Sequence, residues 1–418
     1  MPEIAEAQSL LMALSQSNEV KVEAAPRRRL TQLQVAYGNA LIAARGYGAL
    51  ETTEAFSRAR ESASGDEDAA GRLAADYGLW ASSYMRGDLP SMRAHAEAFL
   101  GDVEARPDSP EASVAHRAAG MTCWFAGEYR EARSHLERAL ALFEPGRDDD
   151  LAFRFAWDPG VAAMASLAIA SWALGEVDRA ISLIDRMQTG IAALTHVGTL
   201  ALGRMHGAMF ELMRGDHPRA AQNAFELARL AREHDLNLWR AFGVFLQGWA
   251  ASQSGAPADG LEDMRRGAEL LREQNALLYD GLLKVVLAEA EALARDPGRA
   301  IAIIDEALAT SNRTGYRAFE AELHRARGEM LLKRDPANPA PAEKAFLTVA
   351  RQQGTRSFEL RAALALAKLY ESSGRPDEAH AVLAPALEDF APTPEMPEIA
   401  EAQTLLVAIE TGAHVRHE

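Results

Sequence analysis

Few residues of this 418-residue chain have the types and spacing that enzyme chemistry requires. Only five lysines occur and none follows a glycine, so there is no Gly-x-x-x-x-Gly-Lys-Ser/Thr loop for nucleotide phosphates. A His-Glu-x-x-His zinc helix and a Gly-x-Ser-x-Gly nucleophile turn are also missing. The carboxylates are plentiful, but no pair of them is marked out for acid–base catalysis. The sequence therefore predicts a protein that is not an enzyme and has no cofactor.

The histidines and the lone cysteine do not form a metal-ligand pattern. His95, His116 and His135 lie on separate predicted helices, whereas a bound metal needs ligands that converge. Cys123 stands among apolar residues, where a small core residue is expected. A single cysteine excludes an internal disulfide and a cysteine-based zinc site. We expect neither kind of site.

The residues that could bind a partner are aromatic and basic. Tyr84, Trp124 and Trp172 each stand three positions before the glycine of a predicted turn. Equivalent positions of a repeat point in equivalent directions, so these side chains should form a stripe. The stripe either packs as core, or it lines a groove and supplies anchors for a partner. In the second case Arg117 and Arg204 would add polar contacts.

A second set of candidates lies in a long connection at residues 146–160. An acidic triplet is followed there by Phe153, Phe155 and Trp157. Long loops in compact proteins are often functional. These aromatic side chains either plug the gap between adjacent hairpins or contact a partner.

The elements that would position all these residues are helices in a repeat. The repeated pattern is an apolar helix end, a glycine, four residues and then a small residue, as in Gly127 to Ala132. The glycine ends the first helix in the left-handed conformation, and acidic residues suit the positive end of the second. The small residue lets the two helices approach closely. These anchor positions recur mostly 40 apart, at residues 92, 132, 180, 220, 260, 300 and 379.

This period predicts an all-α fold, a right-handed superhelical solenoid of antiparallel helix hairpins, tetratricopeptide-like, with a period of about 40. Strand signals are missing from the sequence. Residues 1–26 and 391–418 are expected to hold capping helices, near 2–16 and 397–410. The second helix of the eighth hairpin should be short, because a proline-rich turn precedes it. An array of about nine hairpins is expected within 27–390, at 28–62, 68–105, 110–144, 159–193, 196–234, 237–275, 277–312, 316–352 and 355–389.

The two ends of the chain repeat each other. Residues 1–8, Met-Pro-Glu-Ile-Ala-Glu-Ala-Gln, recur identically at 396–403, and Leu10-Leu11 matches Leu405-Leu406. Such a match is not chance, and it suggests a unit that can recur in tandem, with this chain starting at an internal methionine. A homo-oligomer through the end helices is therefore one hypothesis. The C-terminal helix of one molecule would take the N-terminal helix position on another, in a head-to-tail contact.

Charge and hydropathy exclude several kinds of partner. The net charge of −16 repels phosphate backbones and anionic lipids, so neither nucleic acid nor a membrane is expected. No apolar run approaches the roughly 18 residues needed to span a bilayer. The chain start also lacks a signal-peptide pattern. A cytoplasmic location is expected.

The stretch from Phe155 to Ala163, followed by Leu167-Ala168 and Trp172, resembles the repeat region of a bacterial signalling family. These multidomain proteins join a class III adenylate cyclase domain, a STAND-type ATPase domain and a C-terminal tetratricopeptide region. Segments 127–133 and 374–379 fit the same region. Trp157 and a shortened helix at 346–354 depart from the family pattern. The resemblance covers only the repeats, so no catalytic residue carries over. It implies repeats that sense or dock a partner.

The leading hypothesis is thus a non-catalytic scaffold or sensor that binds a protein or peptide partner on the concave face of the solenoid. A self-assembling structural solenoid and a small-ligand sensor are the alternatives.

Overall fold

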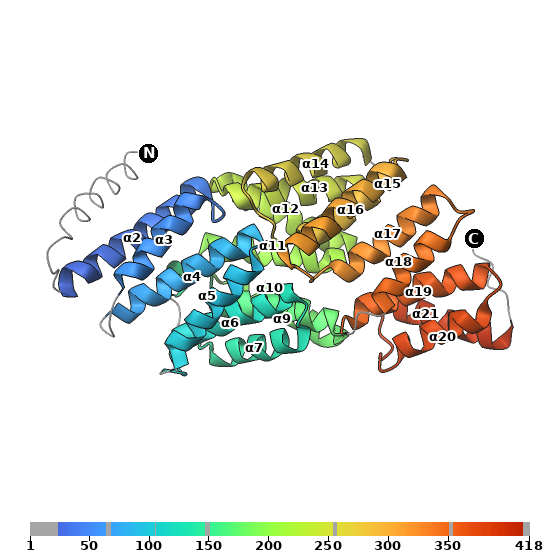
Figure 1. Ribbon diagram of the computed structural model, residues 1–418, viewed down its shortest axis with the longest axis horizontal. Helices are drawn as coiled ribbons and strands as arrows, with labels where there is room; N and C mark the ends of the chain where they lie inside the picture. The colour runs from blue at the N-terminus through green and yellow to red at the C-terminus, as the bar shows by residue number, and fades with distance from the viewer. Residues whose placement is uncertain are drawn as a thin grey trace.

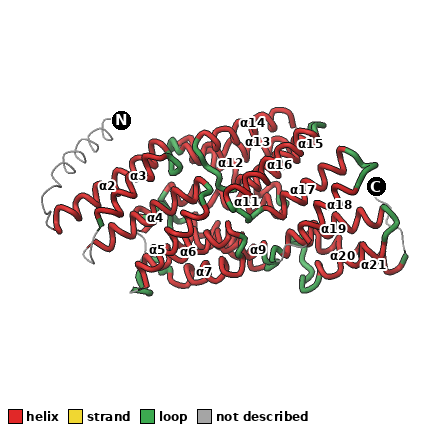
Figure 2. The backbone as a smooth tube through the Cα atoms, viewed as in Figure 1, coloured by secondary structure: helices red, strands yellow, loops and turns green. Residues whose placement is uncertain are grey.

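The computed structural model describes residues 24–63, 68–104, 106–146, 151–253, 257–350 and 354–412. The helix expected near residues 2–16 lies outside these ranges. Within them the regular elements are helices and no strand occurs, as the composition predicts (Figure 2). Consecutive helices pack as antiparallel hairpins along an elongated molecule (Figure 1).

Each hairpin has a first and a second helix. The first helices are α2 (Ala24–Arg45), α4 (Ala69–Arg86), α6 (Pro110–Ala126), α9 (Pro159–Ala173), α11 (Val197–Arg214), α13 (Asn237–Gln253), α15 (Asp280–Leu293), α17 (Glu320–Arg334) and α19 (Arg356–Ser372). The second helices are α3 (Leu50–Ser62), α5 (Leu89–Glu104), α7 (Tyr129–Leu142), α10 (Val177–Ile191), α12 (His217–Glu233), α14 (Pro257–Glu273), α16 (Pro297–Thr314), α18 (Ala340–Ala350) and α20 (Pro376–Leu387). A short helix, α8 (Leu151–Arg154), lies in the long connection, and α21 (Pro397–Thr411) follows the last hairpin. These bounds agree with the predicted hairpins to within a few residues, and α18 is short as expected.

The turn glycines and the small anchors act as the sequence predicts. Gly127 ends α6 with a φ of 82°, a conformation that residues with side chains rarely adopt. Ala132, the anchor on α7, is completely buried. A Cβ atom placed on Gly120 would lie 2.7 Å from Cγ of Leu136, because α6 and α7 are in such close contact. Small residues at these positions therefore set the distance between the helices of a hairpin.

The solenoid closes on itself, because hairpins five places apart along the chain touch. The C-terminal ends of α4, α6 and α9 meet the segments that begin α15, α17 and α19. The equivalent hydrogen bonds run from the Leu277 N–H to the Met85 carbonyl at 2.7 Å, from the Arg317 N–H to the Phe125 carbonyl at 2.6 Å, and from the Ser357 hydroxyl to the Trp172 carbonyl at 2.5 Å. One continuous hydrophobic core runs between these turns of the superhelix. The first helices of the early hairpins therefore face later hairpins and are closed off from solvent there.

Candidate functional site

The aromatic stripe is part of the core. Tyr84, Trp124 and Trp172 occupy equivalent positions on α4, α6 and α9, but only 2%, 1% and 0% of their surface is exposed. The edge of the Trp124 ring packs against Phe319 of a later hairpin, with ring centroids 5.9 Å apart. Trp172 packs edge-to-face against Phe210 of the adjacent hairpin at 5.5 Å, and its carbonyl accepts from the Ser357 hydroxyl of a later hairpin. The interpretation of the stripe as the lining of an open groove is thus corrected, because closure of the superhelix covers it.

The aromatic residues of the long connection also point inward. Phe155 and Trp157 are buried. Phe155 packs edge-to-face against Tyr77 of α4, with ring centroids 5.2 Å apart, and the Trp157 ring lies 6.1 Å from that of Tyr47 in the turn between α2 and α3. Phe153 is in α8, and its side chain lies outside the described part of the structure. The described aromatic side chains plug the space between hairpins and do not form a surface for a partner.

The two candidate arginines lie in separate places. The guanidinium of Arg117 is buried between the rings of Trp80 and Trp157, with centroids 5.1 and 5.2 Å away, where cation–π attraction stabilises its charge. Arg204 is half-buried and donates to the side-chain oxygen of Gln188 on α10 at 2.8 Å. Neither residue joins the aromatic stripe in an open groove.

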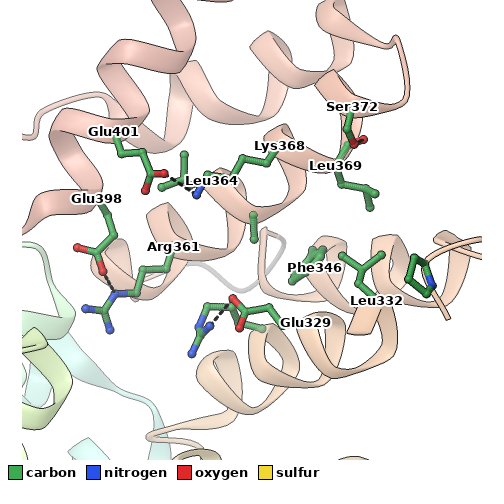
Figure 3. Close-up of a pocket in the computed structure, with 13 residues that line it drawn as sticks. Glu329, Leu332, Phe346, Arg361, Leu364, Lys368, Leu369, Ser372, Glu398 and Glu401 are labelled. Atoms are coloured by element: carbon green, nitrogen blue, oxygen red, sulfur yellow. Dashed lines mark hydrogen bonds and ion pairs between the residues drawn. The ribbon is translucent and has the colours of Figure 1, made fainter. Parts of the chain in front are cut away.

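An open groove of about 650 Å³ lies elsewhere, between α17–α18 and α19–α21 (Figure 3). The described residues include no hairpin five places beyond the eighth or ninth, and Leu332 of α17 and Leu369 of α19 stay partly exposed. We call this feature the C-terminal groove. It is lined by Arg325, Glu329, Leu332, Pro336, Phe346, Arg361, Leu364, Ala365, Lys368, Leu369, Ser372, Glu398 and Glu401.

The floor of the C-terminal groove is apolar. Leu364, Ala365 and Leu369 recur at helical spacing on α19 and so share one face of that helix. Leu332 of α17 lies opposite them, and the buried ring of Phe346 forms the base. Leu332, Ala365 and Leu369 remain partly exposed. The groove therefore offers apolar contact area that no described residue covers.

The walls carry three ion pairs in which the acid is more exposed than the base. Their shortest N–O distances are 2.6 Å for Arg325–Glu329 and 2.7 Å for both Arg361–Glu398 and Lys368–Glu401. The carboxylate side chains are 33%, 24% and 52% exposed, whereas the matching cations are 12%, 14% and 37% exposed. An approaching molecule therefore meets negative charge first.

Two arginines hold the walls in place. Burial disfavours the charge of Arg325, but the carboxylates around it, led by Glu322, raise its pKa above the ordinary value. Arg361 donates to Glu398 and also to the Met213 carbonyl at 2.7 Å, and its guanidinium lies 5.9 Å from the Trp172 ring centroid. This residue thus ties the groove to the closed turn of the superhelix.

Comparison with known proteins supports the fold. No protein-family model matches the sequence. A Rap protein complexed with competence and sporulation factor superposes with a TM-score of 0.54 at 10% identity, over 92% of this chain and 98% of that one. Cut9–Hcn1 of the APC/C gives a TM-score of 0.50 at 15% identity, over 91% of this chain and 59% of that one. The fold is a tetratricopeptide-like helical solenoid.

The solenoid also has a curated relative in Rhizobium meliloti (strain 1021), an uncharacterized protein 24% identical over 252 residues. The match covers 60% of this chain but only 24% of the relative, so the solenoid spans about a quarter of that protein's length. Within the described ranges, no three His, Cys, Asp or Glu side chains gather in a way that could hold a metal ion. None of the described helices has the length and apolar character needed to cross a membrane.

The groove residues were not singled out by the sequence. Leu364 and Leu369 read as ordinary core positions of an amphipathic helix, and Lys368 stood out only as one of five lysines. A signal did exist for Glu398 and Glu401, because both belong to the segment that is repeated at the start of the chain. Their role depends on how many hairpins make one superhelical turn, and no local pattern gives that number.

Proposed function

We propose that this tetratricopeptide-like solenoid is a non-catalytic protein-interaction module whose C-terminal groove binds a segment of a partner protein. The observation that supports it most is the pairing of an uncovered apolar floor with walls whose carboxylates are more exposed than their cations. Partly exposed leucines supply anchor contacts, which carry much of the affinity in protein interfaces. The exposed acids select the charge of the partner.

The chemistry of the groove defines the partner segment. It should present apolar side chains to Leu332 and Leu369, flanked by Lys or Arg that reach Glu329 and Glu401. The net charge of −16 adds long-range attraction for such a cationic segment. A volume of about 650 Å³ accommodates several side chains, which fits a peptide better than a flat protein surface.

Two likenesses support a signalling context for this proposal. The Rap protein that shares the fold is complexed with competence and sporulation factor. The repeat motifs also resemble those of the adenylate cyclase and STAND-type ATPase proteins. We therefore propose that the module acts in bacterial signalling, where it would sense or dock a partner. The cytoplasmic location expected from the sequence stays a prediction.

Selection of peptides from a random displayed library tests the groove directly. The full chain should select segments that combine apolar residues with Lys or Arg, and their affinity should fall as salt is raised. The double variant Glu329→Lys/Glu401→Lys should weaken these peptides by about tenfold or more, since it reverses the groove's exposed charge. Ala365→Trp, which fills the floor, should weaken them independently of salt.

The control changes the same amount of charge elsewhere. Glu226→Lys/Glu233→Lys alters two acids on α12 that pair only with Arg229 on their own helix in the described structure. Peptide affinity should stay close to the wild-type value in this variant. Peptides that bind the Glu329→Lys/Glu401→Lys and Ala365→Trp variants as tightly as the wild type would remove the groove from consideration. A selection that yields no binder would do the same.

A further inference from the structure

The helix that closes the described chain occupies a well-defined seat on its neighbours. The buried face of α21 consists of Ile399, Ala402 and Leu405, and the N-cap residue Met396 extends it; Met396, Ile399 and Ala402 are completely buried. These residues pack on α19 and α20. We call the surface beneath them, together with Arg361 and Lys368, the α21 seat.

Two ion pairs fix the register of α21 on this seat. Glu398 accepts from Arg361 and Glu401 from Lys368, each at 2.7 Å (Figure 3). The two acids lie three positions apart, nearly one helical turn, and their partners lie seven apart, about two turns, on α19. A helix that fills the seat therefore needs acids at fixed positions relative to its apolar face.

The first residues of the chain include a counterpart of every residue that makes these contacts. Residues 1–8 are identical to 396–403, so Met1, Ile4 and Ala7 correspond to the three completely buried residues of α21, and Leu10 corresponds to Leu405. Glu3 and Glu6 correspond to the two acids that bind the arginine and the lysine. An amphipathic helix requires only the spacing of its apolar residues, so this requirement does not explain why the acids, the proline and the glutamine are also identical. The identity therefore includes the residues that pair with Arg361 and Lys368 in the α21 seat.

We infer that the α21 seat is a helix-exchange site that accepts residues 1–14 of a second copy of this chain. The inference is independent of the peptide-binding function proposed above. The occupant comes from a neighbouring molecule because α2, to which these residues are joined, lies at the opposite end of the long axis from α21 (Figure 1). Such a contact joins different surfaces of two copies and so propagates into chains or rings.

The seat can exchange its occupant because α21 is held along a single face. Its outer face includes Val407, which is 58% exposed, whereas Leu406 and Ile409 are partly buried against the core. Like the second helices of the array, α21 packs on two neighbours, α19 and α20, but it does so through fewer residues than any hairpin helix of the described array. Release of α21 therefore breaks fewer packing contacts than release of a helix within the array.

A charge exchange between two full-length variants tests the inference by sedimentation velocity over a range of concentrations. The wild-type chain should associate beyond a dimer as its concentration rises. Lys368→Glu alone should leave association near the wild-type level, because the seat then repels Glu401 of its own α21 and Glu6 of the incoming segment alike. Glu6→Lys alone should weaken association about fivefold, because it places two lysines opposite each other while α21 keeps its ion pair. A mixture of the two variants should bring association back to at least the wild-type level, because the Lys368→Glu seat repels its own α21 and attracts the Glu6→Lys segment.

A second pair of variants separates the buried face from the exposed one. Ile4→Asp should weaken association about a hundredfold or more, because it puts an unpaired carboxylate where the corresponding Ile399 is completely buried in the seat. Ser9→Asp introduces the same group where the corresponding Thr404 is exposed, and should leave association unchanged. A wild-type chain that stays monomeric at every concentration overturns the inference. So does an Ile4→Asp chain that associates normally, or a charge-exchange mixture that shows no recovery.

Discussion

Replacement of Trp172 by alanine distinguishes a core stripe from a binding stripe. The side chain is completely buried beside Phe210, and the guanidinium of Arg361 lies over its ring. Large aromatic side chains bury roughly 150–250 Å², which at about 25 cal/mol per Å² gives roughly 4–6 kcal/mol as an upper limit. Measured Trp-to-Ala substitutions in cores cost about 3–5 kcal/mol. We expect Trp172→Ala to lower the free energy of unfolding by that amount.

The loss should concentrate where two turns of the superhelix meet. The Trp172 carbonyl accepts the Ser357 hydroxyl, so the end of α9 and the start of α19 are held together at this residue. In repeat proteins each unit is stabilised mainly by its neighbours, so damage at one contact is felt locally first. Amide hydrogen exchange should therefore speed up in α9 and α19 more than in the distant hairpin α2–α3.

Trp172→Phe is the matched control. The indole N–H of Trp172 has no hydrogen-bond acceptor in the described structure, so phenylalanine removes volume without breaking a hydrogen bond. It should cost about 1–2 kcal/mol, and urea unfolding together with the thermal midpoint should rank wild type above Phe above Ala. A Trp172→Ala chain with the wild-type midpoint and unchanged exchange in α19 would refute the core assignment and restore the groove interpretation.

Three further substitutions test the packing. Burial lowers the pKa of His206 to about 4 from 6.5 in the unfolded chain, so the unfolded state binds more protons and stability falls as the pH drops from 6.5 towards 4. His206→Phe should remove about 2 kcal/mol of the destabilisation that urea titrations record between pH 7 and pH 5. A Cβ atom on Gly78 would lie 2.4 Å from a phenyl ring on α3, so Gly78→Ala should cost about 1–3 kcal/mol. Gly101→Ala meets nothing within 4 Å on α5 and should raise the thermal midpoint slightly.

The hairpins were predictable because their determinants are local. A glycine that takes a positive φ, such as Gly127, and a small anchor such as Ala132 lie within six residues of each other, and together they specify one turn between two helices. The short α18 was also predictable, because prolines delay the start of the helix after Asp335. Each of these features depends on a few neighbouring residues, which a single sequence displays completely.

The location of the groove was not predictable because its determinants are distant. The same spacing places Trp124 at a core position or in a groove, and the choice depends on whether a later hairpin covers it. Here the Arg317 N–H binds the Phe125 carbonyl beside Trp124, across almost 200 residues of chain. That contact follows from small rotations accumulated over five hairpins. No motif encodes the total rotation. The sequence therefore offers the aromatic residues as candidate anchors, and it does not distinguish the leucines of α19 from core residues.

The two proposals meet in α21, and their relation follows from the repeated ends. Glu398 and Glu401 belong both to the wall of the C-terminal groove and to the contacts that hold α21 in its seat. An incoming segment from a second copy replaces them with Glu3 and Glu6. The residues around these two acids are the same as those around Glu398 and Glu401, because residues 1–8 are identical to 396–403. The exchanged helix therefore rebuilds the same acidic wall, and the groove keeps its preference for a cationic segment. Self-association and partner binding are then compatible, because the residues that exchange are the ones that the two ends share.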